Sequence, residues 1–85
     1  MYRIEFSKAA DRALRKMPTN MAKRIRDKLL HLANDPMSTT QDVKKLVGRP
    51  GYRLRVGNWR VIYEIYHGKL VIVILTVAPR GGVYQ

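Results

Sequence analysis

The C-terminal half of the chain alternates apolar and charged residues in a way that allows little except paired strands. From residue 52 it runs YRLRV, a Gly57-Asn58 turn, WRVIYEIY, a His67-Gly68 turn, and KLVIVILTVAP. Alternation with a period of two is typical of strands, and two-residue turns join strands that pair antiparallel. Residues 52–79 therefore predict a three-stranded antiparallel meander.

The N-terminal half predicts one further strand and two helices. Residues 2–6 alternate as a half-buried strand does, and Ser7 can cap a helix whose apolar residues recur every three or four positions up to Pro18. Thr19 or Asn20 can cap a second helix, which carries the same apolar stripe to about residue 34. Two helices with so short a connection form a hairpin.

Residues 36–50 have no sustained period and predict a loop with one short turn at 43–46. The predicted order is therefore β-α-α-β-β-β in a single domain, residues 1–85. Because the helices and strands are segregated along the chain, the fold class is α+β. We expect a small antiparallel four-stranded sheet packed against an N-terminal helical hairpin.

Three arginines follow the strand alternation onto one face of this sheet. Arg53 and Arg55 point away from the apolar side chains of their strand, and Arg60 meets them across the Gly57-Asn58 turn. Facing like charges destabilise a sheet by about 0.2 to 1 kcal/mol per pair. Their grouping indicates either a bound anion or, as the alternative, ordinary solvated arginines on an open face.

The charge of the whole chain favours a polyanionic partner. Lys and Arg number 17 against 6 Asp and Glu, a formal charge of +11, which attracts nucleic acid or an acidic protein. The chain has no cysteine, and its two histidines are isolated, so we predict no metal and no cofactor. No apolar run is long enough to span a membrane and no signal segment is evident, so we expect a cytoplasmic protein without a membrane partner.

Basic residues also flank the predicted meander on both sides. Lys44, Lys45 and Arg49 lead into its first strand, and we predict them to bind RNA. After its last strand the chain reads APRGGVYQ, where two glycines allow the backbone to fold back. Arg80 and Tyr84 could then approach the arginine face, where a tyrosine can stack on a base.

Two motifs in these segments resemble the RelE/ParE superfamily of bacterial toxins, the RelE branch in particular. They are the R-x-G-x-[WY]-R-[VIL]-x-Y segment beginning at Arg55 and the terminal R-x-x-x-Y, and the resemblance covers essentially the whole chain. It implies a RelE-like fold and the toxin of a toxin–antitoxin system that inhibits translation. The activity implied is a metal-independent endoribonuclease that cleaves mRNA in the A site of the 70S ribosome, against 16S rRNA. The implied protein partner is a cognate antitoxin, in a complex that can bind operator DNA.

The resemblance also implies which residues form the catalytic site. Arg53, Arg55, Arg60, Arg80 and Tyr84 fall on the family's site positions, which bind the scissile phosphate and stabilise charge while the 2′-hydroxyl attacks. A member of the family has lysines where this chain has Arg53 and Arg55, and a guanidinium does not readily accept a proton. The proton of the 2′-hydroxyl would then go to Tyr84, which the family motif favours, or to Glu64.

Two alternatives remain beside the nuclease. One is a ParE-like toxin of the same fold that inhibits DNA gyrase, against which the terminal Arg80-x-x-x-Tyr84 motif argues. The other is a catalytically weak homologue that binds RNA, which the arginines at 53 and 55 favour. Cleavage of mRNA on ribosomes separates the nuclease from both alternatives.

Overall fold

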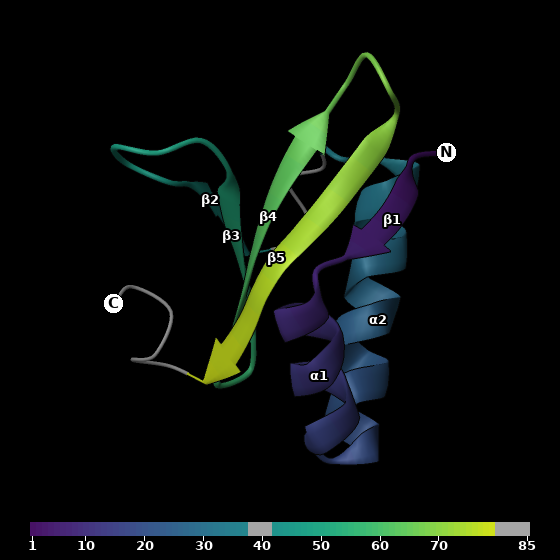
Figure 1. Cartoon of the computed structure of the whole chain (residues 1–85), viewed down its shortest axis with the longest axis vertical. Coiled ribbons are helices and arrows are strands. Elements are labelled where there is room, and N and C mark those ends of the chain that lie inside the picture. Colours follow the sequence, from purple (N-terminus) through teal and green to yellow (C-terminus); the bar gives the residue numbers. More distant parts are fainter. Residues whose placement is uncertain (38–41, 80–85) are drawn as a thin grey trace.

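A computed structural model describes residues 1–37 and 42–79, which form a helical layer and a sheet layer (Figure 1). In chain order the elements are β1 (Arg3–Phe6), α1 (Lys8–Lys16), α2 (Thr19–Asn34), β2 (Val43–Lys45), β3 (Tyr52–Val56), β4 (Trp59–Tyr66) and β5 (Val71–Pro79). The predicted class, α+β with a helical hairpin against one sheet, is confirmed.

The sheet has the order β1-β5-β4-β3-β2, and the meander β3-β4-β5 is antiparallel as predicted. The sheet differs from the prediction in containing five described strands. Val43–Lys45 pairs with β3 as a short edge strand where a turn was expected, because the Arg55 amide donates to the Asp42 carbonyl at 2.9 Å and the Leu46 amide donates to the Gly51 carbonyl at 3.0 Å. Three residues are too few to show a strand period.

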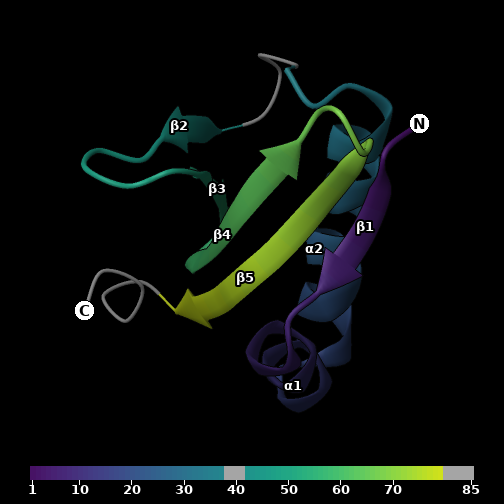
Figure 2. The same ribbon diagram turned by 45° about the horizontal axis from the view of Figure 1, so that its top comes forward.

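The first strand also differs from the prediction, because β1 pairs parallel with β5 and the sheet is therefore mixed. Backbone bonds at both ends of β1 fix this direction. The Arg3 amide donates to the Leu70 carbonyl at 2.8 Å, and the Ser7 amide donates to the Ile74 carbonyl at 2.9 Å. In Figure 2, α2 lies behind β1 and β5.

The two helices begin differently. Ser7 caps α1 as predicted, with its Oγ accepting from the Ala10 amide at 3.0 Å. The predicted cap of α2 by Thr19 or Asn20 is wrong, because α2 follows Pro18 directly and has no side-chain cap. None of the helices that the structure describes is long and apolar enough to cross a membrane.

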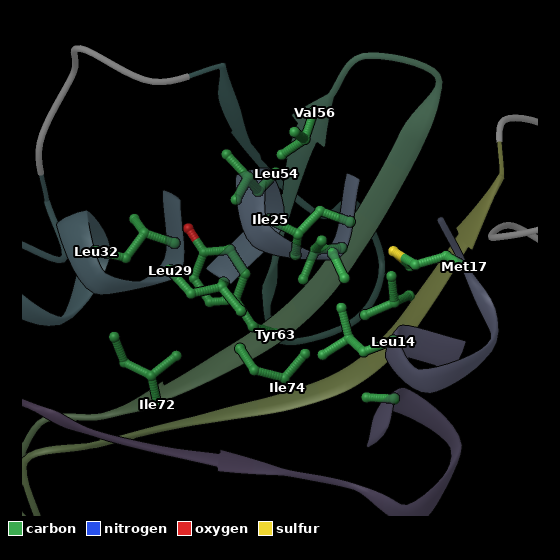
Figure 3. Packing of buried hydrophobic residues seen from close by; sticks show 14 residues of the cluster. Leu14, Met17, Ile25, Leu29, Leu32, Leu54, Val56, Tyr63, Ile72 and Ile74 are labelled. Carbon is green, nitrogen blue, oxygen red and sulfur yellow. The ribbon is translucent and has the colours of Figure 1, made fainter. Parts of the chain in front are cut away.

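Apolar side chains of both helices meet one face of the sheet (Figure 3). Leu14, Ile25 and Leu29 contribute from the helices, and Leu54 and Tyr63 contribute from the sheet, each at most 3% exposed. Full burial of such a side chain stabilises the fold by about 1.5 to 3 kcal/mol. Since both described helices pack on this face, we call the opposite one, which carries the arginines, the open face.

The second hairpin turn is longer than predicted. Residues 67–70 connect β4 to β5, so β5 begins at Val71 after a turn that includes Leu70 at φ 54°. The two-residue His67-Gly68 turn was therefore wrong, while Gly57 takes the predicted tight turn with φ 59°.

Candidate nucleic-acid interface

Strand register brings basic side chains together at the β2-β3-β4 end of the open face. Arg55 pairs with Arg60, and Arg53 pairs with Ile62 on one side and with Lys44 on the other. Cross-strand partners point to the same side of a sheet. Lys44, Arg53, Arg55 and Arg60 therefore occupy two adjacent rows, which we call the arginine face.

Two guanidinium nitrogens of the arginine face are buried without an acceptor from the described residues. Arg53 Nε and Arg60 Nη1 have no hydrogen-bond partner in the part of the chain that the structure describes. Ile62 lies between them on the open face and is only 1% exposed. A buried donor without an acceptor is costly, and a charged one more so, so an anion placed here would be held by donors that are already desolvated.

Arg55 differs because it already has an anionic partner. Its Nε lies 2.7 Å from Asp42 Oδ2, in an ion pair whose side chains are 55% and 39% exposed. Sequence reasoning missed Asp42. The available signal was that Asp42 is the single acidic residue between Asp35 and Glu64, within an otherwise basic segment.

The remaining predicted residues divide into three groups. Lys45 pairs with Tyr52 and so points to the other side of β2. Arg49 is exposed in the 46–51 loop. Of the three predicted RNA-binding residues, Lys44 is therefore the one that joins the arginine face. Arg80 and Tyr84 lie outside the described residues. The last described residue, Pro79, follows Ala78, which is the β5 partner of Arg60.

Glu64, the other predicted proton acceptor, lies on the open face two residues beyond Ile62. Its carboxylate accepts a 2.6 Å hydrogen bond from the Tyr66 hydroxyl. This hydrogen bond, together with the charge of Glu64, raises the pKa of Tyr66. Glu64 is therefore engaged with Tyr66, next along β4 on the side away from Arg60.

Neither histidine joins the arginine face. His31 is exposed near the end of α2, and His67 Nδ1 lies 2.8 Å from the Tyr2 hydroxyl at the opposite end of β4. Across residues 1–37 and 42–79, no group of three or more His, Asp or Glu side chains could hold a metal ion. What the described residues offer chemically is a set of fixed cationic donors.

Comparison with known proteins relates the chain to toxins of toxin–antitoxin systems. A family model described as "ParE toxin of type II toxin-antitoxin system, parDE" matches residues 4–84. RelE1 of Methanocaldococcus jannaschii is 27% identical over 86 residues, covering 99% of this chain and 96% of its own length. The archaeal RelE-RelB complex from Pyrococcus horikoshii contains a chain 34% identical with a TM-score of 0.81, covering 96% of this chain and 98% of that one. The toxin–antitoxin complex RelBE2 of Mycobacterium tuberculosis contains a chain that is 26% identical with a TM-score of 0.79. The match covers 93% of this chain and 98% of that one.

Proposed function

The chain belongs to the RelE/ParE superfamily of type II toxin–antitoxin toxins, as a toxin of the RelE kind, and from this premise we propose that it is a ribosome-dependent endoribonuclease. Its substrate would be mRNA in the ribosomal A site. The 2′-hydroxyl of one nucleotide would attack the adjacent phosphorus, and the bond from phosphorus to the 5′-oxygen would break. The products would be a 2′,3′-cyclic phosphate and a 5′-hydroxyl, formed without a metal ion.

The observation that carries this proposal is the pair of buried, unpartnered nitrogens, Arg53 Nε and Arg60 Nη1. Negative charge on the phosphate oxygens grows as the 2′-oxygen attacks. Donors that are fixed and desolvated before the reaction stabilise such charge more strongly than solvated ones do. Arg53 and Arg60 would therefore bind the scissile phosphate, with Arg55 and Lys44 beside them.

Proton transfer would be assigned to other groups, because guanidinium stays protonated. The family motif gives Arg80 and Tyr84 to the same site, and we propose that Tyr84, as its phenolate, takes the proton of the 2′-hydroxyl, while the departing 5′-oxygen takes a proton from water. Glu64 is the second candidate, although its carboxylate is engaged by Tyr66.

We also propose a cognate antitoxin as the protein partner. The relatives from Pyrococcus horikoshii and Mycobacterium tuberculosis are complexes of such a toxin with its antitoxin. With a formal charge of +11, this chain favours an acidic segment as the partner. Contacts with 16S rRNA, and binding of the complex to operator DNA, belong to the same proposal.

Primer extension on mRNA in a purified translation system tests the nuclease. The wild-type protein should give cuts only when ribosomes are present, and Arg60→Ala and Arg53→Ala should slow cleavage by about 10²- to 10³-fold, the usual effect of removing one such donor. Arg12→Ala, an exposed arginine of α1, is the matched control and should cleave at the wild-type rate. Wild-type cleavage rates in both site variants would refute the assigned roles.

Inhibition of DNA gyrase is the second candidate, favoured by the family model that matches residues 4–84, which is described by the ParE toxin. It predicts that the purified protein inhibits supercoiling by gyrase and leaves translation unaffected. Salt-sensitive binding to ribosomes without any cleavage product would instead indicate a catalytically weak RNA-binding homologue.

A further inference from the structure

The edge of the sheet contains a second basic site beside the arginine face. β2 pairs with β3 only over Tyr52–Leu54, so the outer edge of β3 has no paired strand from Arg55 onward, although the Arg55 amide still donates to the Asp42 carbonyl. A hollow of about 180 Å³ lies there, lined by residues of α2, of β3, of the β3-β4 turn and of the segment before β2. A cavity needs only about 10 to 15 Å³ to hold one water, so this hollow has room for a phosphate group.

Three cations from two elements line this hollow with one carboxylate. Arg24 and Lys28 come from α2, Arg55 comes from β3, and Asp42 is the carboxylate, which leaves a formal charge of +2. Arg24 reaches over the β3-β4 turn, since a Cβ added at Gly57 would lie 3.8 Å from Arg24 Nη1. Residues 24, 28 and 55 are thus brought together by packing across the sheet edge.

The Asp42 carboxylate is the anion that Arg55 holds in the described residues. Its Oδ2 lies 2.7 Å from Arg55 Nε, while the pair is about half exposed. Exposed ion pairs are weak and exchange readily, and a phosphodiester offers oxygens that match a guanidinium at least as well as a carboxylate does. Arg55 is also the cross-strand partner of Arg60, so the hollow adjoins the arginine face.

We propose that this hollow binds a phosphodiester group of RNA, which replaces Asp42 as the partner of Arg55 while Arg24 and Lys28 add their charges. The phosphate would be one that flanks the phosphate held by Arg53 and Arg60. Asp42 then acts as an internal competitor that weakens non-productive binding of RNA. The inference rests on the proposed function only in taking RNA as the polyanion.

Binding of an uncleavable RNA tests the site separately from catalysis. A fluorescent 2′-O-methyl RNA 12-mer lacks the attacking hydroxyl, and its dissociation constant is measured by anisotropy over a range of NaCl concentrations. Asp42→Asn should tighten binding about twofold to fivefold, the size of effect that an exposed ion pair can have. Arg24→Gln should weaken it and reduce the slope of log K against log salt by about 0.7, the loss of one contact to a single-stranded phosphate.

Asp11 and Arg15 provide the matched control, because they form an exposed ion pair of the same kind on α1, 3.0 Å between Arg15 Nη2 and Asp11 Oδ2. Asp11→Asn and Arg15→Gln change the net charge equally, so they measure the general electrostatic effect. The site is supported if Asp42→Asn and Arg24→Gln change the dissociation constant for RNA more than the two control variants do. The Arg24→Gln/Asp42→Asn double variant should then no longer show these changes. Equal changes at both pairs, with all variants folded by thermal melting, overturn it.

Two further measurements distinguish a phosphate site from a carboxylate site and RNA binding from RNA cleavage. A glutamate 12-mer whose affinity responds to Asp42→Asn as strongly as that of RNA would show that the hollow takes carboxylates, and the phosphate assignment would fail. Specific changes in RNA binding with no cleavage on ribosomes would support the hollow and refute the nuclease. Cleavage on ribosomes without specific changes in RNA binding would support the nuclease and refute the phosphate site in the hollow.

Discussion

Tyr63 combines full burial with a hydroxyl that has no partner among residues 1–37 and 42–79. The residue is 0% exposed, its ring stacks on Tyr52 with centroids 5.6 Å apart, and its hydroxyl has no hydrogen bond among the described residues. A buried hydroxyl without a partner costs about 1 to 3 kcal/mol, whereas the ring contributes by burial alone. The phenol therefore stabilises the fold through its ring and destabilises it through its oxygen.

We expect Tyr63→Phe to raise the free energy of unfolding at pH 7, by about 1 kcal/mol, because the substitution removes only the unpaired oxygen. Urea denaturation at equilibrium measures this change. Tyr52→Phe, at the partly buried neighbour in the stack, is the control and should alter stability less. A clear loss of stability in Tyr63→Phe would show that the hydroxyl has a partner in solution.

The same group predicts a pH dependence. Burial, and secondarily Tyr52, raises the pKa of Tyr63 well above its ordinary value of 10.0. The folded state holds the Tyr63 proton more tightly than the unfolded state does. The free energy of unfolding therefore keeps its full value, as far as Tyr63 is concerned, below about pH 10, and it falls as the pH rises above 10. Melting curves between pH 9 and 11 should show the wild type losing more stability than Tyr63→Phe.

For single residues, the sequence predicts the side of the sheet to which a side chain points better than it predicts which residue that side chain contacts. Alternation alone places Arg53, Arg55 and Arg60 on one face, because the side-chain period of a strand is fixed by its geometry. It does not reveal that Arg55 is paired with Asp42, since that contact exists only after β2 has paired with β3. The burial of Arg53 Nε and Arg60 Nη1 likewise depends on packing around them.

Gly51 controls how closely the start of β3 approaches β4. Its φ is +112°, and an added Cβ would lie 2.8 Å from the Tyr63 carbonyl oxygen, too close for any side chain. Gly48, three residues earlier in the same loop, has φ +78° but open space around it. The two glycines therefore separate the cost of backbone conformation from the cost of a clash.

We expect Gly48→Ala to destabilise the fold by about 1 to 2 kcal/mol, the penalty for a left-handed backbone. Gly51→Ala should cost roughly 1 to 3 kcal/mol more, because the methyl group meets main chain that cannot move without disturbing β4. Chemical denaturation of both variants gives the difference. Equal losses would mean that β3 shifts freely relative to β4.

The elements themselves could be predicted in proportion to their length and periodicity. β3, β4 and α1 carry strong patterns and form where the patterns indicate, with Ser7 as the cap. β2 could not be predicted because three residues are too few to show the alternation of a strand. The parallel pairing of β1 with β5 escapes because alternation identifies a strand but neither its neighbour nor its direction.

At the scale of the whole molecule, positive charge opposes folding. The formal charge is +11, of which all but the charge of Arg80, or 11 − 1 = +10, belongs to the described residues, whose longest extent is 32 Å. At 0.01 M ionic strength the Debye length is about 30 Å, so nearly all the cations repel one another, whereas at 0.15 M it is about 8 Å. The ion pairs of Arg3, Arg15 and Arg55 are exposed and offset little of this repulsion.

We therefore expect the melting temperature of the free chain to rise as NaCl increases from about 0.01 to 0.15 M, in contrast to proteins in which salt mainly screens attractions. Each kcal/mol of relieved repulsion corresponds to about 4 to 8 °C for a domain of this size. Calorimetry at several salt concentrations measures the rise. A double variant, Lys16→Glu/Lys23→Glu, lowers the formal charge from +11 by 4 to +7 at two exposed helix positions and should flatten the dependence. A melting temperature that falls with salt in the wild type would show that attractive pairs outweigh the net charge.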